Sequence, residues 1–347
     1  MFGPAGPRFA GGRRSVAAGP CASIMRPVGL RGGIDLGGTK IQAVVVDDDH
    51  QVLGQARVPT PTEGGPTDVA DAMASALQQA ASEASTSSGE LEGVGAGSPG
   101  DVDSEAGTVT GARNLPGGGA TFPLAQLLQE RLGAPARVSN DVRVTTMAEA
   151  SIGAGRGFRS MLGVAWGTGV GGGLILDGRP WVGRGAAGEI GHMVVKIGGA
   201  QCPCGRVGCM EAYAGRAAME RRARKRHEEG TKTDLLKIME KRGRTRMTSG
   251  VWARALDADD KLAIELVDEA VEAIAAAVAS VVNLLDVEGV VIAGGLGIRL
   301  GEPYVERIGA AMQPHLFVDQ RPPEVRLAAL GDLGGAIGAS LLVGEPA

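Results

Sequence analysis

The chain contains 347 residues, and its 57 glycines make up about 16% of it, where soluble proteins average ~7%. Glycine and proline together reach about 22%, which is below the ~25–30% of low-complexity chains, and no Gly-X-Y period is present, so a disordered chain and a collagen are excluded. The formal net charge of −4 argues against an overall attraction to nucleic acid or to an anionic membrane. No apolar run reaches the ~18 residues of a membrane span, so we expect a soluble, cytoplasmic protein.

The first residues differ in composition from the rest of the chain. Residues 1–33 contain five arginines and no acidic residue, together with many glycines, alanines and prolines. We expect residues 1–29 to be a disordered tail, or to precede a true translation start at Met25. A transit peptide is the alternative; secretion is disfavoured because the segment has no apolar h-region.

Apolar runs separated by turn residues predict an opening meander of three strands, near 33–34, 41–46 and 52–58. A helix over 69–84 follows, which Thr67 and Asp68 can cap. A meander at the start of the chain favours mixed sheets over purely parallel ones.

Strands and helices alternate through the rest of the chain. The expected elements are a strand at 91–97, a strand ending at 138–139, a helix over 142–154, paired strands at 160–166 and 172–176, one or two core helices within the glycine-free residues 251–288, a strand ending in Gly294 and Gly295, and a closing helix over 331–343. This alternation predicts an α/β fold. Strand–glycine turn–strand units at 33–46 and 160–176 indicate two duplicated halves around one nucleotide.

Two glycine-rich turns are candidate phosphate cradles, because backbone amides in such turns converge on an anion with no Cβ in the way. They contribute the candidates Asp35, Gly37, Gly38, Thr39, Lys40, Gly167, Thr168 and Gly169. A carboxylate beside a phosphate can hold Mg²⁺ through water, which is the role expected of Asp35. The alternative for each turn is an ordinary hairpin with glycine at positive φ.

Known nucleotide motifs do not account for these turns. No Walker A sequence is present. The pattern GxGxxG occurs at 95–100 and 167–172, but no helix follows to supply the N-terminus that a dinucleotide fold requires. We expect these glycines in loops between antiparallel strands.

A cluster of one histidine and three cysteines predicts a metal site. Nine residues separate His192 from Cys202, one separates Cys202 from Cys204, and four separate Cys204 from Cys209. Three thiolates and an imidazole form a closed Cys₃His set, typical of structural zinc. Such a zinc ion cannot activate water, and it would organise the loop 192–209 and its flanking residues Glu189 and Glu211. Unliganded thiols are the alternative.

Taken in order, these motifs resemble the ROK family of bacterial sugar kinases and repressors, within the actin-like/hexokinase ATPase superfamily. The match covers roughly residues 30–345 and is closest in appearance to the glucokinase-type members. Its motifs are GIDLGGTK (33–40), GSPG (97–100), NLPG (114–117), SND (139–141), GTGVGGG (167–173), GEIGH (188–192), CPCGRVGCMEAYAG (202–215) and VVIAGG (290–295). The resemblance implies a two-domain, ribonuclease H-like fold with mixed sheets, flanking helices and a cleft between the domains.

The resemblance also implies roles for single residues. Asp141 is expected to be the catalytic base, taking the proton of the sugar 6-hydroxyl as it attacks the γ-phosphate of Mg-ATP. Asp141 could otherwise be a helix N-cap. The residues expected to contact the sugar are Asn114, Asn140, Asp141, Glu189, His192 and Glu211, and Gly294 and Gly295 are expected to lie along ATP with Thr168 and Gly169.

The expected domains follow from the same pattern. Residues 30–137, completed by the C-terminal helix 331–347, form a smaller α/β domain, and residues 138–330 form a larger one that carries the cysteine loop. The expected cofactors are ATP, Mg²⁺ and structural Zn²⁺, and the family resemblance implies a homodimer.

Two departures from the family pattern lie near the sugar and leave the substrate open. No aromatic residue follows NLPG, and Val142, Arg143 and Val144 replace the small residues usual after the motif ND. Glucose is expected first; fructose, mannose, N-acetylmannosamine and N-acetylglucosamine are alternatives, and polyphosphate could replace ATP.

A transcription regulator is the second class of function considered. About 30 residues precede the first motif, too few for a helix-turn-helix domain. The basic run 216–226 is interleaved with glutamate, as in a solvated helix face. We therefore expect no nucleic acid partner and no membrane partner, only a small-molecule sugar and ATP.

Overall fold

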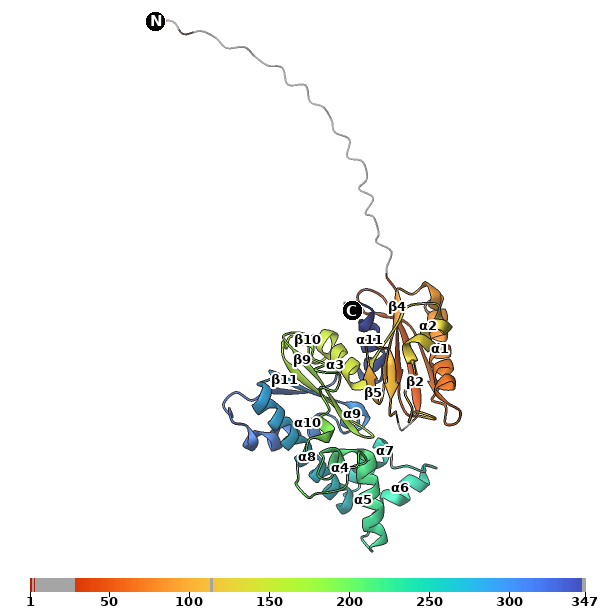
Figure 1. Ribbon diagram of the computed structural model, residues 1–347. Coiled ribbons are helices and arrows are strands. Elements are labelled where there is room, and N and C mark those ends of the chain that lie inside the picture. The colour runs from red at the N-terminus through yellow and green to blue at the C-terminus, as the bar shows by residue number, and fades with distance from the viewer. Residues whose placement is uncertain (2, 4–28, 113–114, 345–347) are drawn as a thin grey trace.

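The computed structural model describes residues 1, 3, 29–112 and 115–344 (Figure 1). Its strands are β1 (Arg31–Leu36), β2 (Lys40–Val46), β3 (Val52–Pro59), β4 (Gly93–Ser98), β5 (Asp101–Asp103), β6 (Thr108–Thr110), β7 (Ala136–Asn140), β8 (Met161–Trp166), β9 (Val170–Leu176), β10 (Arg179–Pro180), β11 (Gly289–Ala293) and β12 (Glu324–Leu327). Its α-helices are α1 (Pro66–Glu83), α2 (Leu124–Leu132), α3 (Asp141–Ile152), α4 (Glu211–Ala214), α5 (Arg216–Glu228), α6 (Leu235–Lys241), α7 (Ser249–Asp257), α8 (Lys261–Leu285), α9 (Gly294–Leu300), α10 (Glu302–Met312) and α11 (Gly334–Ser340).

Two five-stranded sheets with equivalent topology organise the described chain. The first has the order β3-β2-β1-β4-β7 and the second the order β10-β9-β8-β11-β12. In each sheet a three-stranded antiparallel meander continues into two parallel strands. The expected mixed sheets and the expected duplication are therefore confirmed.

Helices cover the sheets and join them. Helices α1 and α2 pack on one face of the first sheet and α11 on the other (Figure 1). Helix α3 packs against β8 and β9 of the second sheet and also against α11, so the pair α3 and α11 lies between the two sheets. Small residues allow this close approach: a Cβ added at Gly338 would overlap the carbonyl oxygen of Val144.

The sequence predicts one or two helices for the glycine-free residues 251–288, and they form two, α7 and α8. Helix α7 ends before Asp259, whose φ of 54° breaks the segment. The side chain of Asp260 then caps α8, accepting a hydrogen bond from the amide of Ala263 at 2.8 Å. Helix α8 buries an apolar face rich in alanine and valine within the larger hydrophobic core.

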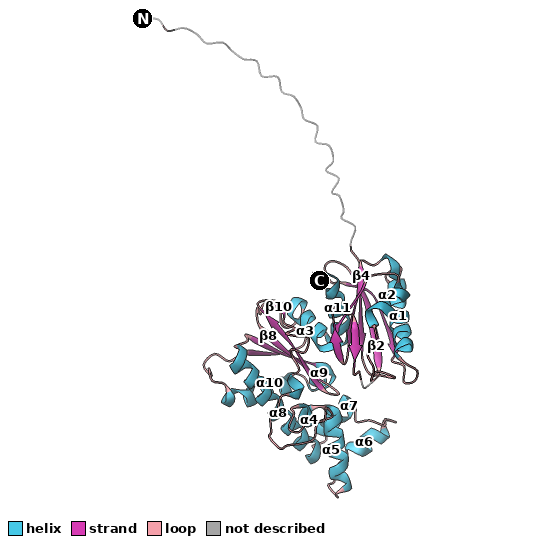
Figure 2. Cartoon of the chain, viewed as in Figure 1, coloured by secondary structure: helices cyan, strands magenta, loops and turns pink. Residues whose placement is uncertain are grey.

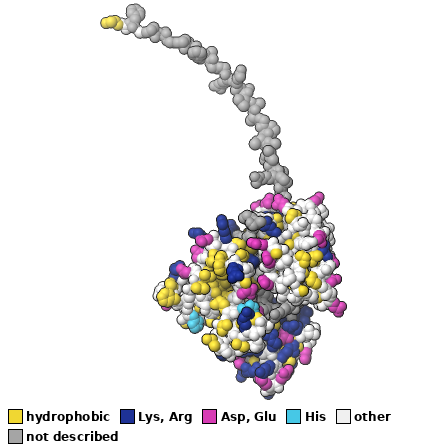
Figure 3. Space-filling model, in the orientation of Figure 1, with side chains coloured by type: hydrophobic (Ala, Val, Ile, Leu, Met, Phe, Trp, Pro, Cys, Tyr) yellow, Lys and Arg dark blue, Asp and Glu magenta, His cyan; other side chains and the backbone are white. Residues whose placement is uncertain are grey.

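A helical group, α4 to α7, lies beyond the second sheet (Figure 2). Basic side chains gather on this group, interspersed with acidic ones (Figure 3). On α5, Arg222 pairs with Glu269, and Arg226 pairs with Glu265 at 2.8 Å. These ion pairs fit the expected solvated, charge-balanced face. Among the described helices, none combines the length and apolarity of a membrane span.

Three local expectations are wrong. Thr67 lies inside α1, whose N-cap is Gly65, so of the two expected capping residues only Asp68 takes part, accepting a hydrogen bond from the Gly65 amide at 2.8 Å. Strand β11 ends at Ala293, because Gly294 adopts a φ of 82° and begins α9. The first GxGxxG does not lie between antiparallel strands, because β4 pairs in parallel with β1 and β7, and β5 pairs with β6 in a separate two-stranded sheet. The second GxGxxG, at residues 167–172, does lie at the turn between two antiparallel strands, β8 and β9.

Candidate active site

A cleft of about 810 Å³ collects loops from both sheets. The sequence-predicted residues that line it are Gly37, Gly38, Thr39, Lys40, Asn140, Asp141, Gly167, Thr168, Gly169, Glu189, His192, Glu211 and Gly295. Its volume falls within the ~300–1,000 Å³ of small-molecule sites. Residues more than 250 positions apart in sequence thus line the same cleft.

Of the residues predicted for the sugar and the nucleotide, two described ones, Asp35 and Gly294, are not among those that line the cleft, and a third falls outside the described residues. Asn114 lies outside the described residues. Gly294 faces inward, where an added Cβ would lie 2.6 Å from backbone atoms of Trp166. Asp35 lies on β1 close to Asp141, whose charge contributes to the pKa of Asp35.

Asp141 begins α3 directly after β7. The capping role falls to Asn140, whose Oδ1 accepts hydrogen bonds from the amides of Val142 at 3.0 Å and Arg143 at 3.2 Å. Asp141 is therefore not the N-cap, although its Oδ1 also accepts a hydrogen bond from the amide of Val142 at 2.9 Å, and it lines the cleft. Burial raises the pKa of Asp141 to about 6, and the charge of Glu189 contributes. A carboxylate with this pKa is mostly ionised at neutral pH and can accept a proton.

Asp35 is a second buried carboxylate, close to Asp141. Burial raises the pKa of Asp35 to about 7, and the nearby charge of Asp141 raises it further. Lys40 opposes this shift and itself pairs with Asp332 at 3.0 Å. Two neighbouring carboxylates whose charged forms are disfavoured by burial form a place where a cation would be stabilised.

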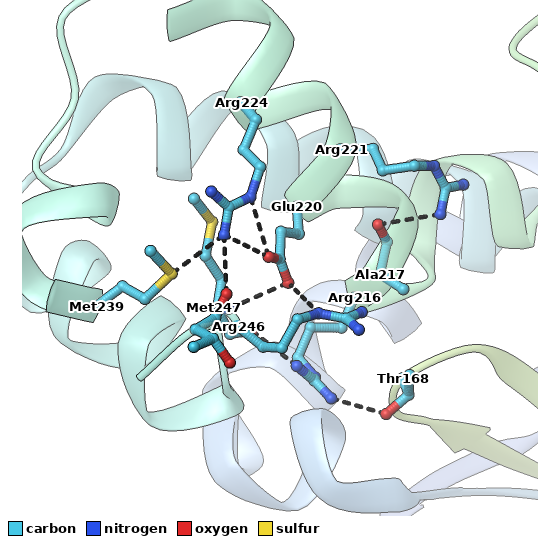
Figure 4. Close-up of polar contacts among 10 residues, drawn as sticks. Thr168, Arg216, Ala217, Glu220, Arg221, Arg224, Met239, Arg246 and Met247 are labelled. Atoms are coloured by element: carbon cyan, nitrogen blue, oxygen red, sulfur yellow. Dashed lines mark hydrogen bonds and ion pairs between the residues drawn. The ribbon is translucent and has the colours of Figure 1, made fainter. Parts of the chain in front are cut away.

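The turn between β8 and β9 forms the second glycine loop. It is closed by a hydrogen bond from the amide of Gly167 to the carbonyl oxygen of Gly169 at 3.0 Å. The hydroxyl of Thr168 accepts a hydrogen bond from Arg216 Nη2 at 2.7 Å (Figure 4). Arg216 Nη1 also donates to the carbonyl oxygen of Met247 at 2.7 Å. Because Arg216 donates to Thr168, the Thr168 hydroxyl keeps its own proton for another acceptor.

Three further side chains, Glu189, His192 and Glu211, line the cleft, and two of them also reach the cysteine loop. Glu189 Oε2 lies 3.9 Å from His192 Nε2, and His192 Nδ1 lies 3.9 Å from Cys202 Sγ. Glu211 Oε2 accepts a hydrogen bond from the amide of Val170 at 2.9 Å. These carboxylates and the imidazole can bind several hydroxyl groups of one polyol.

The structure brings the four predicted metal ligands together. One ligand atom each from His192, Cys202, Cys204 and Cys209 lies within 4.8 Å of the others. The sulfur atoms of Cys204 and Cys209 are 3.8 Å apart, and the three cysteines form no disulfide. Gly205 and Gly208 adopt φ values of 92° and 81°, which give the tight turns between the sulfurs. The cluster can hold a metal ion.

Sequence reasoning missed several lining residues. They are Pro99–Val102, Val142, Arg143, Gly185–Ala187, Arg216 and Ser249, among others. Arg216 was visible only as the start of a basic run, and Arg143 only as a departure from the family pattern.

Comparison with known proteins agrees with the motifs. Residues 31–345 match the ROK family. A glucokinase of Halalkalibacterium halodurans is 33% identical over 316 residues, covering 90% of this chain and 94% of that protein. An N-acetyl-D-glucosamine kinase of Pectobacterium atrosepticum is 32% identical, covering 89% of this chain and 97% of that protein.

Solved structures of ROK family kinases share the fold of this chain. A ROK family glucokinase from Streptomyces griseus in complex with glucose and AMPPNP aligns with a TM-score of 0.77 at 30% identity, covering 90% of this chain and 99% of that one. A ROK hexokinase from Thermus thermophilus aligns with a TM-score of 0.73 at 35% identity, covering 90% and 97%. The chain therefore belongs to the ROK family and has the actin-like ATPase fold of that family's sugar kinases.

Proposed function

We propose that this sugar kinase transfers the γ-phosphoryl group of ATP to the 6-hydroxyl of glucose. The observation that carries the proposal is the meeting, in one cleft, of Asp141, both glycine loops and a group of side chains suited to a polyol. The relative from S. griseus, solved with glucose and an ATP analogue, supports this pairing of substrates.

Asp141 serves as the general base. Its carboxylate accepts the proton of the attacking hydroxyl, so that the O–H bond breaks as the new O–P bond forms and ADP leaves. Asn140, whose Oδ1 is engaged by the helix amides, presents its amide nitrogen as a donor to the sugar. Glu189, His192 and Glu211 bind further hydroxyls, and we assign Asn114 the same role from its motif.

The two glycine loops bind the phosphates. Because the amides of Gly37 and Gly167 already donate within their own turns, the backbone amides of residues 38–39 and 168–169 are the ones that would bind the phosphate oxygens, with the Lys40 ammonium and the Thr168 hydroxyl beside them. Gly294 and Gly295 continue this surface along the nucleotide. Asp35 would hold Mg²⁺ through water, and the ion, when bound, neutralises charge on the phosphates.

We propose zinc for the cysteine cluster. A tetrahedron of ~2.3 Å Zn–S bonds has edges of about 3.8 Å, which matches the separation of the Cys204 and Cys209 sulfurs. The neutral or anionic soft ligands of this cluster suit zinc, and four protein ligands leave no position for substrate. The metal is therefore structural, holding His192 with Nδ1 toward the cluster and Nε2 toward Glu189.

We divide the chain into a smaller domain, residues 30–137 completed by the C-terminal helix, and a larger domain, residues 138–330. The packing of α11 on the first sheet supports this division. A homodimer, a cytoplasmic location and the start at Met25 stay predictions from the sequence.

A kinase for N-acetylglucosamine or another hexose is the second candidate. Relatives named N-acetyl-D-glucosamine kinase and N-acetylgalactosamine kinase reach 32% identity, nearly that of the glucokinases. A ROK transcriptional regulator also shares the fold, with a TM-score of 0.75 at 22% identity, which bears on the fold alone.

A coupled ADP-release assay distinguishes these candidates. The purified chain is tested with Mg-ATP and glucose, mannose, fructose, N-acetylglucosamine and N-acetylmannosamine, and then with polyphosphate in place of ATP. We expect the highest kcat/KM with glucose. Preference for an acetylated sugar would favour the second candidate, and sugar binding without turnover would favour a sensor.

A further inference from the structure

Arg143 connects α3 to the loop that forms one wall of the cleft. It lies two residues after Asp141, and its side chain is only 8% exposed. Its Nη2 donates to the carbonyl oxygen of Gly185 at 2.7 Å, and its Nη1 donates to Ser139 Oγ at 3.3 Å. The helix that carries the proposed base thus also holds a loop from the second sheet.

The loop over residues 181–188 needs such a contact. Gly183, Gly185 and Gly188 all have positive φ, so this backbone gains much conformational freedom when it detaches. The loop is fixed at its start by a hydrogen bond from Trp181 N to the Leu174 carbonyl at 2.9 Å. Its end is fixed by close packing of Gly188 against Gly172. Arg143 supplies a hydrogen bond from outside the loop between these two points.

Packing alone gives the loop little support. A second cavity, of about 590 Å³, lies beside it and is lined by Arg143, Pro180 and Val182. Trp181, Val182 and Arg184 are exposed on the loop itself. The hydrogen bond from Arg143 therefore has more influence on the loop's position than it would have in a filled core.

The loop leads directly into the sugar-binding residues. Gly185, Ala186 and Ala187 line the cleft, and Glu189, which also lines it, comes directly after Gly188 at the end of the loop. We infer that Arg143 is a positioning residue for the sugar. By holding Gly185, it sets how far the loop over residues 181–188, and Glu189 after it, lies from the proposed base Asp141. This inference rests on the proposed function and deepens it, because it names what fixes the sugar side of that site.

The test uses two variants and a matched control. Arg143→Met keeps the length of the side chain and removes its donors, and Arg143→Lys retains one charged donor. Arg137→Met is the control, because Arg137 lines the second cavity without lining the cleft. Thermal unfolding of every variant shows whether the fold is retained.

The first measurement needs no enzymatic activity. Arg184 is exposed within the loop, so trypsin cleavage after Arg184, followed by mass spectrometry on the full chain, reports how often the loop detaches. We expect cleavage to be about tenfold faster in Arg143→Met, because a hydrogen bond from a charged donor is lost. Arg143→Lys should lie between, and Arg137→Met should match the parent.

The second measurement is the steady-state rate. In Arg143→Met we expect the KM for the sugar to rise about tenfold while the KM for ATP changes less than about twofold, with partial recovery in Arg143→Lys. Unchanged cleavage and unchanged sugar KM would overturn the inference. Equal rises in both KM values with a lowered unfolding temperature would also overturn it, since that pattern describes general destabilisation. If the parent chain phosphorylates no sugar, the proposed function fails. The cleavage rates still test whether the hydrogen bond from Arg143 holds the loop at Gly185.

Discussion

Glu211 joins the cysteine loop to the second glycine loop: its Oε2 accepts a hydrogen bond from the amide of Val170 at 2.9 Å, while its Oε1 lies 3.8 Å from Cys202 Sγ. His192 makes a similar connection, with one ring nitrogen toward Cys202 and the other toward Glu189. Any disturbance of the cysteine cluster is therefore passed to two side chains that line the cleft.

Removal of one thiol should reduce stability and sugar affinity together. We expect Cys204→Ser to lose bound zinc, to unfold at a lower temperature and to raise the KM for the sugar about tenfold or more, because the metal orients His192 and Glu211. Metal content, thermal unfolding and steady-state kinetics measure these effects. Cys21→Ser, a change outside the described residues, is the matched control. A chelator that strips the metal and alters neither property would contradict a structural zinc.

Substitution of the proposed base should separate binding from turnover. Asp141→Asn keeps the shape of the side chain and removes its ability to accept a proton, so kcat should fall by about 10²–10⁴-fold. Sugar binding measured by calorimetry should persist. The unfolding temperature should hold or rise, because burial disfavours the charge that is removed.

Asp177→Asn is the control for that change. Asp177 lies in the turn after β9 with a φ of 51°, a conformation that asparagine tolerates well. It should retain full turnover. Near-normal kcat in Asp141→Asn would exclude Asp141 as the base.

The raised pKa of Asp141, about 6, predicts the acidic limit of activity. Below that pH the carboxyl group is protonated and cannot accept the proton of the sugar, so kcat/KM should rise with pH through about 6 and then level. The charge of Glu189 contributes to this pKa, so Glu189→Gln should move the limit to lower pH as well as weaken sugar binding. A pH profile of kcat/KM that is flat from 5 to 8 would argue against Asp141 as the titrating base.

The same two carboxyl groups predict how stability varies with pH. The pKa of Asp35 is raised to about 7 and that of Asp141 to about 6, both from the ordinary aspartate value of 3.8. Between about pH 3.8 and pH 7 the folded chain binds more protons than the unfolded chain. The contribution of these two groups to the free energy of unfolding is therefore present at low pH and is lost as the pH rises toward 7. Asp35→Asn should flatten the decline. Denaturant unfolding of both forms at pH 5 and pH 7.5, without nucleotide, measures it; an equal decline in both would contradict the raised pKa of Asp35.

Local sequence was sufficient for most strands, the two glycine loops and the cysteine cluster, because each depends on residues close together in the chain. It was not sufficient where distant segments meet. Arg216 reaches Thr168 across 48 residues of sequence, and no pattern within either segment indicates the contact. The end of β11 was misplaced for a related reason: the close approach of Gly294 to Trp166, which requires glycine there, is a tertiary feature.

The contact between Arg216 and Thr168 predicts an effect on the nucleotide side of the reaction. Arg216→Met should raise the KM for ATP about tenfold and lower kcat, because the Thr168 hydroxyl loses the donor that orients it. The KM for the sugar should change little. Arg221→Met, on the same helix and bonded to the carbonyl of Ala217 (Figure 4), is the control. A larger effect on the sugar KM than on the ATP KM would contradict this role.

The glycine excess has a structural cause beyond the loops. Gly33 and Gly95, on neighbouring strands of the first sheet, lie directly under α11, where an added Cβ would overlap the carbonyl oxygens of Ala336 and Ala339. Helix α11 also packs against α3, which carries Asp141. The approach of this helix to the sheet thus fixes the position of Asp141, the proposed base, relative to the first glycine loop.

An added methyl group at Gly95 should therefore force the helix away from the sheet. We expect Gly95→Ala to lower the free energy of unfolding by about 2 kcal/mol or more, because backbone atoms cannot yield as a flexible side chain would. Gly119→Ala is the matched control, since an added Cβ there meets nothing within 4 Å, and it should change stability by less than about 0.5 kcal/mol. Urea unfolding of the two variants beside the parent measures the difference. Equal stability of both variants would show that α11 is not held against the sheet as tightly as these glycines allow.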